Sequence, residues 1–130
     1  MKKRVLLWMS ILLLWGSSLF AQDVPVGVVV AFKQGNSVTL GKYLGDKVEV
    51  IIEAHNTATD RDAAEAAMAE FFSLHRVKQF VINHQGQRNE SSFVIGTLVT
   101  ADGDYRVNCF FRRVQNKYVI HQIRIDKTNG

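Results

Sequence analysis

The chain has 130 residues, 22% of them charged, and a formal net charge of +4. This length suits a single domain. Three basic residues, Lys2, Lys3 and Arg4, stand at the start, and from residue 22 onward 13 Lys and Arg oppose 12 Asp and Glu. Because the mature charge nearly cancels, the sequence lacks the basic balance of a nucleic-acid-binding protein.

The N-terminus has the three-part layout of a secretory signal peptide. The basic start is followed by an apolar run from Val5 to Trp15 and by small residues up to Ala21. A membrane-spanning helix needs about 20 mostly apolar residues, so we favour a cleaved signal over a retained anchor. Cleavage after Ala21 fits best, and cleavage after Ser18 is the alternative. The expected organisation is a signal peptide at 1–21 and one domain at 22–130.

The expected destination is outside the cytoplasm. We expect the periplasm, with secretion beyond the cell as the alternative, and no membrane association once the signal is removed. No cysteine follows the apolar run, which excludes a lipid-anchored lipoprotein. The only cysteine, Cys109, has no partner for an intramolecular disulfide and is predicted to be a small buried hydrophobe.

The first half of the mature chain is predicted to be mainly helical. Residues 24–32 are ambiguous, because their β-branched side chains favour a strand while Pro25 and Gly35 suit the two ends of a helix. Ser37 is expected to cap a short helix that ends near residue 44. Residues 47–53 alternate as in a strand.

The most distinct helix is predicted at 62–75. Asp62 and Glu65 have the spacing of a capping box, and apolar residues follow at helical intervals. His75 ends this helix, where a positive charge is favourable. His55, further upstream, is expected in a loop.

Four strands are predicted in the second half, at 78–84, 92–100, 105–113 and 118–125. Short turns join them into an antiparallel meander. A two-residue turn at Asp102-Gly103 would pair Leu98 with Val107 and Thr100 with Tyr105. A three-residue loop at 115–117 would pair Cys109 with Ile123 and Phe111 with His121. These registers gather the apolar residues on one face, which helices must cover.

The two faces of this sheet predict two kinds of site. His84 and His121 are in phase with the core-facing residues, and with Tyr105 they are expected to line a pocket. The opposite face carries apolar side chains on adjacent strands, which indicates either a partner surface or a patch covered by arginine stems. The expected interface residues are Phe93, Ile95, Phe110 and Ile120.

The order of elements and several short stretches resemble a known family. The chain is similar to a domain-of-unknown-function family of small exported bacterial proteins, which have the nuclear-transport-factor-2-like (NTF2-like, or cystatin-like) α+β fold. The matching stretches are residues 31–36, 71–72, 80–86, 95–98, 118–120 and 124–125. The resemblance implies a helix at 24–32, the element order α-α-β-α-β-β-β-β, and a cone with a pocket between N-terminal helices and a curved antiparallel sheet. It implies no activity.

Enzymes on this fold, such as ketosteroid isomerases and polyketide cyclases, use an acid or base in the pocket. Here the carboxylates fall at strand ends, helix caps and turns, which leaves His84 or His121 as the base and Tyr105 as the donor. The sequence shows no metal-ligand spacing, no phosphate-binding glycine loop and no nucleophile signature. We therefore expect no metal, no cofactor and no assigned catalytic residue.

The favoured function is a non-catalytic exported domain. It would bind a small apolar ligand or peptide in the pocket, form a homodimer through the sheet face, or do both. The alternative is an isomerase-, dehydratase- or cyclase-like enzyme with a pocket histidine as acid and base.

Expression of the full chain in a Gram-negative host tests the signal peptide. We expect the mature protein to begin at Gln22 and to contain 109 residues, as intact-mass measurement of the periplasmic fraction would show. A mass that starts at Leu19 would select the alternative site. An uncleaved chain in the membrane fraction would contradict the prediction.

Overall fold

The computed structural model of the chain describes residues 24–128. The predicted signal peptide and its cleavage site lie outside the described residues. Six strands form one sheet in the order β2-β1-β6-β5-β4-β3, and neighbouring strands are antiparallel except β1 and β6. The elements are α2 (Val26–Gln34), α3 (Ser37–Gly41), β1 (Leu44–Ile52), β2 (His55–Ala58), α4 (Arg61–Leu74), β3 (Val77–Arg88), β4 (Ser91–Thr100), β5 (Gly103–Val114) and β6 (Lys117–Lys127).

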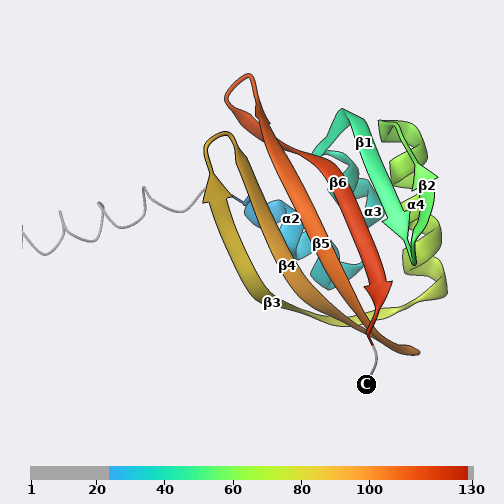
Figure 1. Cartoon of the computed structure of the whole chain (residues 1–130). Coiled ribbons are helices and arrows are strands. Elements are labelled where there is room, and N and C mark those ends of the chain that lie inside the picture. The colour runs from blue at the N-terminus through green and yellow to red at the C-terminus, as the bar shows by residue number, and fades with distance from the viewer. Residues whose placement is uncertain (1–23, 129–130) are drawn as a thin grey trace, which may run out of the picture.

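The helices all lie on one face of the sheet, which curves around them (Figure 1). α2 packs on β3 and on α3, while α4 packs on β1, β2 and α3. We call the helix-covered side the inner face and the other side the outer face. The predicted α+β class with N-terminal helices on a curved sheet is confirmed. The structure adds the short strand β2, because residues Glu53 and Ala54 both adopt positive φ and turn the chain back onto β1. The expected loop at His55 is therefore wrong.

The three predicted helices are present, with two caps displaced. α2 ends at Gly35 with φ of 61°, as its sequence indicates. α4 is capped by Asp60, whose side chain accepts a hydrogen bond from the backbone N–H of Ala63 at 2.8 Å, and Asp62 lies in the first turn. Similarly, Asn36 rather than Ser37 caps α3. In each case the residue before the helix, with extended backbone, does the capping.

The core fills the space between the helices and the inner face. Phe32 of α2 is fully buried, stacks on Phe80 of β3 with ring centroids 5.2 Å apart, and meets the edge of Phe72 at 6.2 Å. Phe71 of α4 packs edge-on against Tyr105 of β5 at 5.2 Å. Cys109 is buried as predicted, and burial raises the pKa of its thiol. Aromatic side chains thus occupy the centre of the cone.

The hairpin between β4 and β5 differs from its predicted register by two residues. Leu98 pairs with Tyr105 and Thr100 with Gly103, because the turn is at Ala101-Asp102. A shift of two residues leaves each side chain on the same face. The predicted division of β4 and β5 into inner and outer residues is therefore correct although the pairs are not.

The hairpin between β5 and β6 has a two-residue turn in place of the predicted three-residue loop. Gln115 and Asn116 both have positive φ, and Phe111 pairs with Ile120. A β-bulge follows, in which His121 is the extra residue, and Cys109 then pairs with Ile123 as predicted. A second bulge inserts Asn83 in β3, between the pairs that Ile82 and His84 make with β4. These bulges shift the alternation of both strands.

Replacement of Gly96 by Ala tests the packing under Phe80. A Cβ atom at Gly96 would lie 2.5 Å from two atoms of the Phe80 ring and 2.8 Å from the carbonyl oxygen of Val81. We expect Gly96→Ala to destabilise the fold by about 1–3 kcal/mol, measured by urea denaturation. In a Phe80→Leu background the same change is expected to destabilise less. Equal stability of Gly96→Ala and wild type would contradict this account.

Candidate binding site on the outer face of the sheet

Both histidines that were expected in the pocket lie on the outer face. His84 pairs with Ile95 and its ring is 5.4 Å from that of Phe93. His121 is 6.4 Å from the ring of Phe110. In each strand the bulge places two consecutive side chains on one side of the sheet, so the histidine leaves the phase of the core. The expectation that they face the core is wrong for this reason.

Tyr105 does lie on the inner face, and it is only 2% exposed. Its hydroxyl oxygen is 3.2 Å from Nδ1 of His75, and that nitrogen is 2.8 Å from Oδ2 of Asp102. Since a carboxylate only accepts hydrogen bonds, Nδ1 carries a hydrogen and donates a hydrogen bond to Asp102. The structure therefore joins Tyr105 to the end of α4 and to the β4–β5 turn, and does not bring it together with His84 or His121.

Electrostatics at this cluster favour the pairing of His75 with Asp102. Hydrogen bonds from Thr100 and from His75 lower the pKa of the Asp102 carboxyl. Burial, and the carboxylates of Asp102 and Glu53, raise the pKa of the Tyr105 phenol. The phenol therefore stays protonated at neutral pH. The arrangement anchors the C-terminal end of α4 to the sheet.

The four expected interface residues divide into three and one. Phe93, Ile95 and Phe110 lie half-buried on the outer face, with Phe93 directly opposite Phe110 on the neighbouring strand. Ile120 is fully buried in the core. Ile120 precedes the bulge at His121 and pairs with the core residue Phe111. The bulge adds one residue, so residues with even numbers point inward before it and outward after it. The expected place of Ile120 on the outer face is wrong. We call Phe93, Ile95 and Phe110 the apolar patch.

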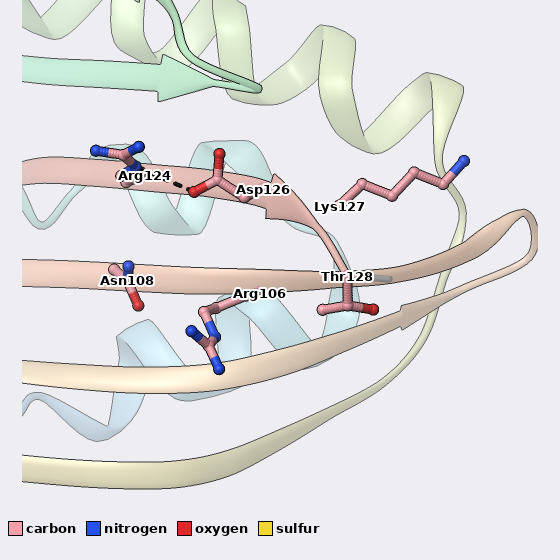
Figure 2. A pocket seen from close by; sticks show the side chains of 6 residues that line it. All are labelled: Arg106, Asn108, Arg124, Asp126, Lys127 and Thr128. Atoms are coloured by element: carbon pink, nitrogen blue, oxygen red, sulfur yellow. Dashed lines mark hydrogen bonds and ion pairs between the residues drawn. The ribbon is translucent and has the colours of Figure 1, made fainter. Parts of the chain in front are cut away.

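A polar pocket lies toward the C-terminal end of β6 (Figure 2). It adjoins the apolar patch, because Asn108 of the pocket pairs with Ile95. Its volume is about 550 Å³. Cross-strand pairing builds it, since Arg106 is opposite Asp126 and Asn108 is opposite Arg124. The pocket-lining residues are Arg106, Asn108, Arg124, Asp126, Lys127 and Thr128. Thr128 closes one end, because its backbone N–H and its hydroxyl both donate to the carbonyl oxygen of Asp104, at 3.0 and 3.1 Å.

Charges in the pocket are only partly paired within the protein. Arg124 Nε donates to Oδ2 of Asp126 at 3.0 Å. Among the described side chains, no carboxylate lies within ion-pair distance of the Arg106 guanidinium. The side-chain oxygen of Asn108 is shielded from solvent and has no hydrogen-bond partner in the described part of the chain. The pocket therefore holds an unpaired cation next to an unpaired acceptor.

Sequence reasoning did not single out this pocket. The signal was present, because Arg106, Asn108, Arg124 and Asp126 fall in the outward phase of two adjacent strands. That phase is ordinarily polar, so composition alone does not distinguish a pocket from a solvated face. The predicted pair of Cys109 with Ile123 already places Arg106 opposite Asp126 and Asn108 opposite Arg124. What the sequence does not reveal is that these outward side chains border a pocket.

Comparison with known proteins places the chain in a family. A family model described as a domain of unknown function, DUF4783, matches residues 26–126. The chain belongs to the DUF4783 family. Crystal structures of DUF4783 proteins from Bacteroides uniformis and Bacteroides ovatus are 64% and 55% identical to it, with TM-scores of 0.80 and 0.82. They cover 83% and 85% of this chain, and all of each solved chain is matched. No curated protein matches it.

More distant structures show the fold alone. A candidate dehydratase of the NTF2-like family from Streptomyces avermitilis is 12% identical, with a TM-score of 0.58 over 81% of this chain and 91% of its own. A candidate calcium/calmodulin-dependent protein kinase type II association domain from Thiobacillus denitrificans is 14% identical, with a TM-score of 0.66 over 83% and 98%. This DUF4783 protein thus has the NTF2-like fold that its sequence resembles. None of its helices within residues 24–128 is long and apolar enough to cross a membrane.

The pKa of His121 gives a test of its position on the outer face. Partial burial, and then the charge of Arg112, lower this pKa, while Glu49 opposes them. We expect NMR titration to place it below the ordinary value of about 6.5, and Arg112→Gln to move it upward. A value at or above that of the urea-unfolded chain would contradict the prediction.

The same shift has a defined effect on stability. In the unfolded chain His121 has the higher pKa, so the unfolded state binds more protons as the pH falls below about 6.5. The contribution of neutral His121 to stability is therefore complete above that pH. It is lost as the pH falls from there through the folded-state pKa. His121→Gln is expected to remove this part of the pH dependence in urea denaturation.

Proposed function

We propose that this DUF4783 protein is an exported, non-catalytic module that associates with a second copy of itself through the outer face of its sheet. The observation that carries the proposal is the apolar patch, which lies on the face that no described helix covers. Phe93 and Phe110 are direct cross-strand neighbours, and Ile95 adjoins them on β4. Contiguous apolar area of this kind typically marks an interaction surface.

Filling of the inner face supports the outer face as the binding surface. The side chains of Phe32, Phe71 and Tyr105, each at most 4% exposed, occupy the centre of the space where an apolar ligand was expected. Two of the three side chains proposed as pocket lining, His84 and His121, lie on the opposite side of the sheet. Both observations support the outer face, and not the space under the helices, as the binding surface.

The size and charge of the outer face suit a twofold contact. Five strands spaced about 4.8 Å apart, and about 33 Å long, give roughly 800 Å², which is what each partner contributes to an interface of standard size. A twofold axis lets one patch pair with itself, so no second surface has to be complementary. The face carries both charge signs, with Arg106 and Arg112 near Glu49 and Asp126, which permits opposite charges to meet across the axis.

A fold neighbour adds support. The structure from Thiobacillus denitrificans is named as an association domain. At 14% identity that name carries no assembly geometry to this chain. It is consistent with a fold that can serve association.

Charge insertion into the apolar patch tests the association. We expect the mature chain to be a dimer by light scattering after size exclusion, and Phe110→Asp or Phe93→Asp to weaken dimerisation at least about thirtyfold, the effect of losing one hot-spot residue. Both side chains are half-buried on the outer face and neither belongs to the core cluster, so the fold should be retained by circular dichroism.

Val26→Asp is the matched control. Val26 is 66% exposed on α2, away from the outer face. Its replacement by Asp adds the same charge as the patch variants without touching the patch. This variant should remain dimeric. A monomeric wild type at its highest soluble concentration, or a dimer that survives both patch substitutions, would overturn the proposal. Ile120→Asp would not serve, because Ile120 is in the core.

A further inference from the structure

The polar pocket on the outer face has the makings of a ligand site of its own. It is formed by a single chain, where the first half of β5 lies beside the C-terminal end of β6. Arg106 and Arg124 face it together with one carboxylate, Asp126, a formal charge of +1, while the Lys127 side chain points away from Arg106 (Figure 2). An anion is therefore the kind of ligand that its field attracts.

Arg106 is the principal cation. Arg124 is already engaged with Asp126, whereas Arg106 has no ion-pair partner among the described side chains. A guanidinium binds a carboxylate in a fork of two parallel hydrogen bonds. Arg106 emerges next to Asn108 on the same side of β5, and Figure 2 shows the Asn108 oxygen on the side of Arg106.

Asn108 indicates which group the ligand should carry next to its anionic group. Its Oδ1 atom is buried and unpartnered, and an acceptor left in this state is a free-energy penalty that natural structures seldom keep without a reason. A ligand made only of acceptors, such as a fully ionised phosphate, would place oxygen against oxygen there. A ligand that carries an N–H donor next to its anionic group would satisfy Asn108 and Arg106 together.

We propose that this pocket binds an α-carboxylate with a neighbouring amide N–H, the chemistry of an N-acyl amino acid and of a peptide C-terminus. The carboxylate pairs with the guanidinium of Arg106. The amide N–H donates to Oδ1 of Asn108, which has no hydrogen-bond partner among the described residues, once the side chains around it move aside. Asp126 holds Arg124 in place and restricts the pocket to a single negative charge.

Three small probes separate the parts of this chemistry. N-acetyl-leucine has both groups, N-acetyl-leucinamide lacks the carboxylate, and the O-acetyl ester of leucic acid lacks the N–H. Chemical-shift titration of the mature chain by NMR should give binding of the first, with shifts at Arg106 and Asn108. We expect the other two to bind at least about fivefold more weakly. Equal binding of acid and amide, or of amide and ester linkages, would overturn the proposal.

Charge variants test the assigned residue. Arg106→Gln is expected to weaken N-acetyl-leucine at least about tenfold, and Asn108→Leu to abolish the preference for N–H over ester. Arg113→Gln removes an exposed arginine from the same strand outside the pocket and is expected to leave binding unchanged. Equal losses in Arg106→Gln and Arg113→Gln would reduce the effect to overall charge. Inorganic phosphate that binds as tightly as N-acetyl-leucine would also overturn the proposal.

The same experiment distinguishes a peptide C-terminus from a free N-acyl amino acid as the ligand. It also shows whether ligand binding competes with dimerisation. A tetrapeptide with an apolar residue before a C-terminal leucine should gain affinity over N-acetyl-leucine if the source is a peptide, because the apolar patch adjoins the pocket. Equal affinity would point to a free N-acyl amino acid, and both results support the carboxylate–amide chemistry. Titrations at two protein concentrations, with sedimentation velocity, show whether dimerisation competes, so a failed dimer and a failed ligand site are distinguishable.

Discussion

Curvature of the sheet around its helices is the constraint on which this structure depends. The aromatic core built on Phe32 lies on the concave side of the sheet, and β3 and β6 carry β-bulges, among them those that insert Asn83 and His121. A bulge bends its strand at the price of the regular alternation. The placement of Ile120 inside, and of His84 and His121 outside, follows from that single device.

The elements themselves were largely predictable because their signals are local. The helix at 61–74 and the strands of the second half follow from periodicity and from turn residues. The two-residue turns at 53–54 and 115–116 have no glycine, although both residues in each adopt positive φ. Such turns normally use Asn-Gly or Asp-Gly. A sequence without that signal gives no way to place the turn.

The candidate site was less predictable because it depends on register. Alternation assigned Phe93, Ile95 and Phe110 to the outer face correctly, since β4 has no bulge against β5. It failed for the histidines, which lie at or beside an inserted residue. The pocket around Arg106 needs both the β5–β6 register and the end of β6, where Thr128 bonds to Asp104. The β5–β6 register at these residues was predicted correctly, whereas the hydrogen bonds from Thr128 to Asp104 leave no signal in a single sequence.

The parallel pairing of β1 with β6 has a consequence for the order in which the chain folds. β6, the last strand, lies inside the sheet between β1 and β5, so the strand that begins the sheet in sequence obtains this neighbour only when the last eleven-residue strand is present. Contacts between segments so far apart slow folding, because the entropy lost in closing the long loop between them opposes the contact. Until β6 has formed, β1 is therefore paired only with β2, and its other edge is open.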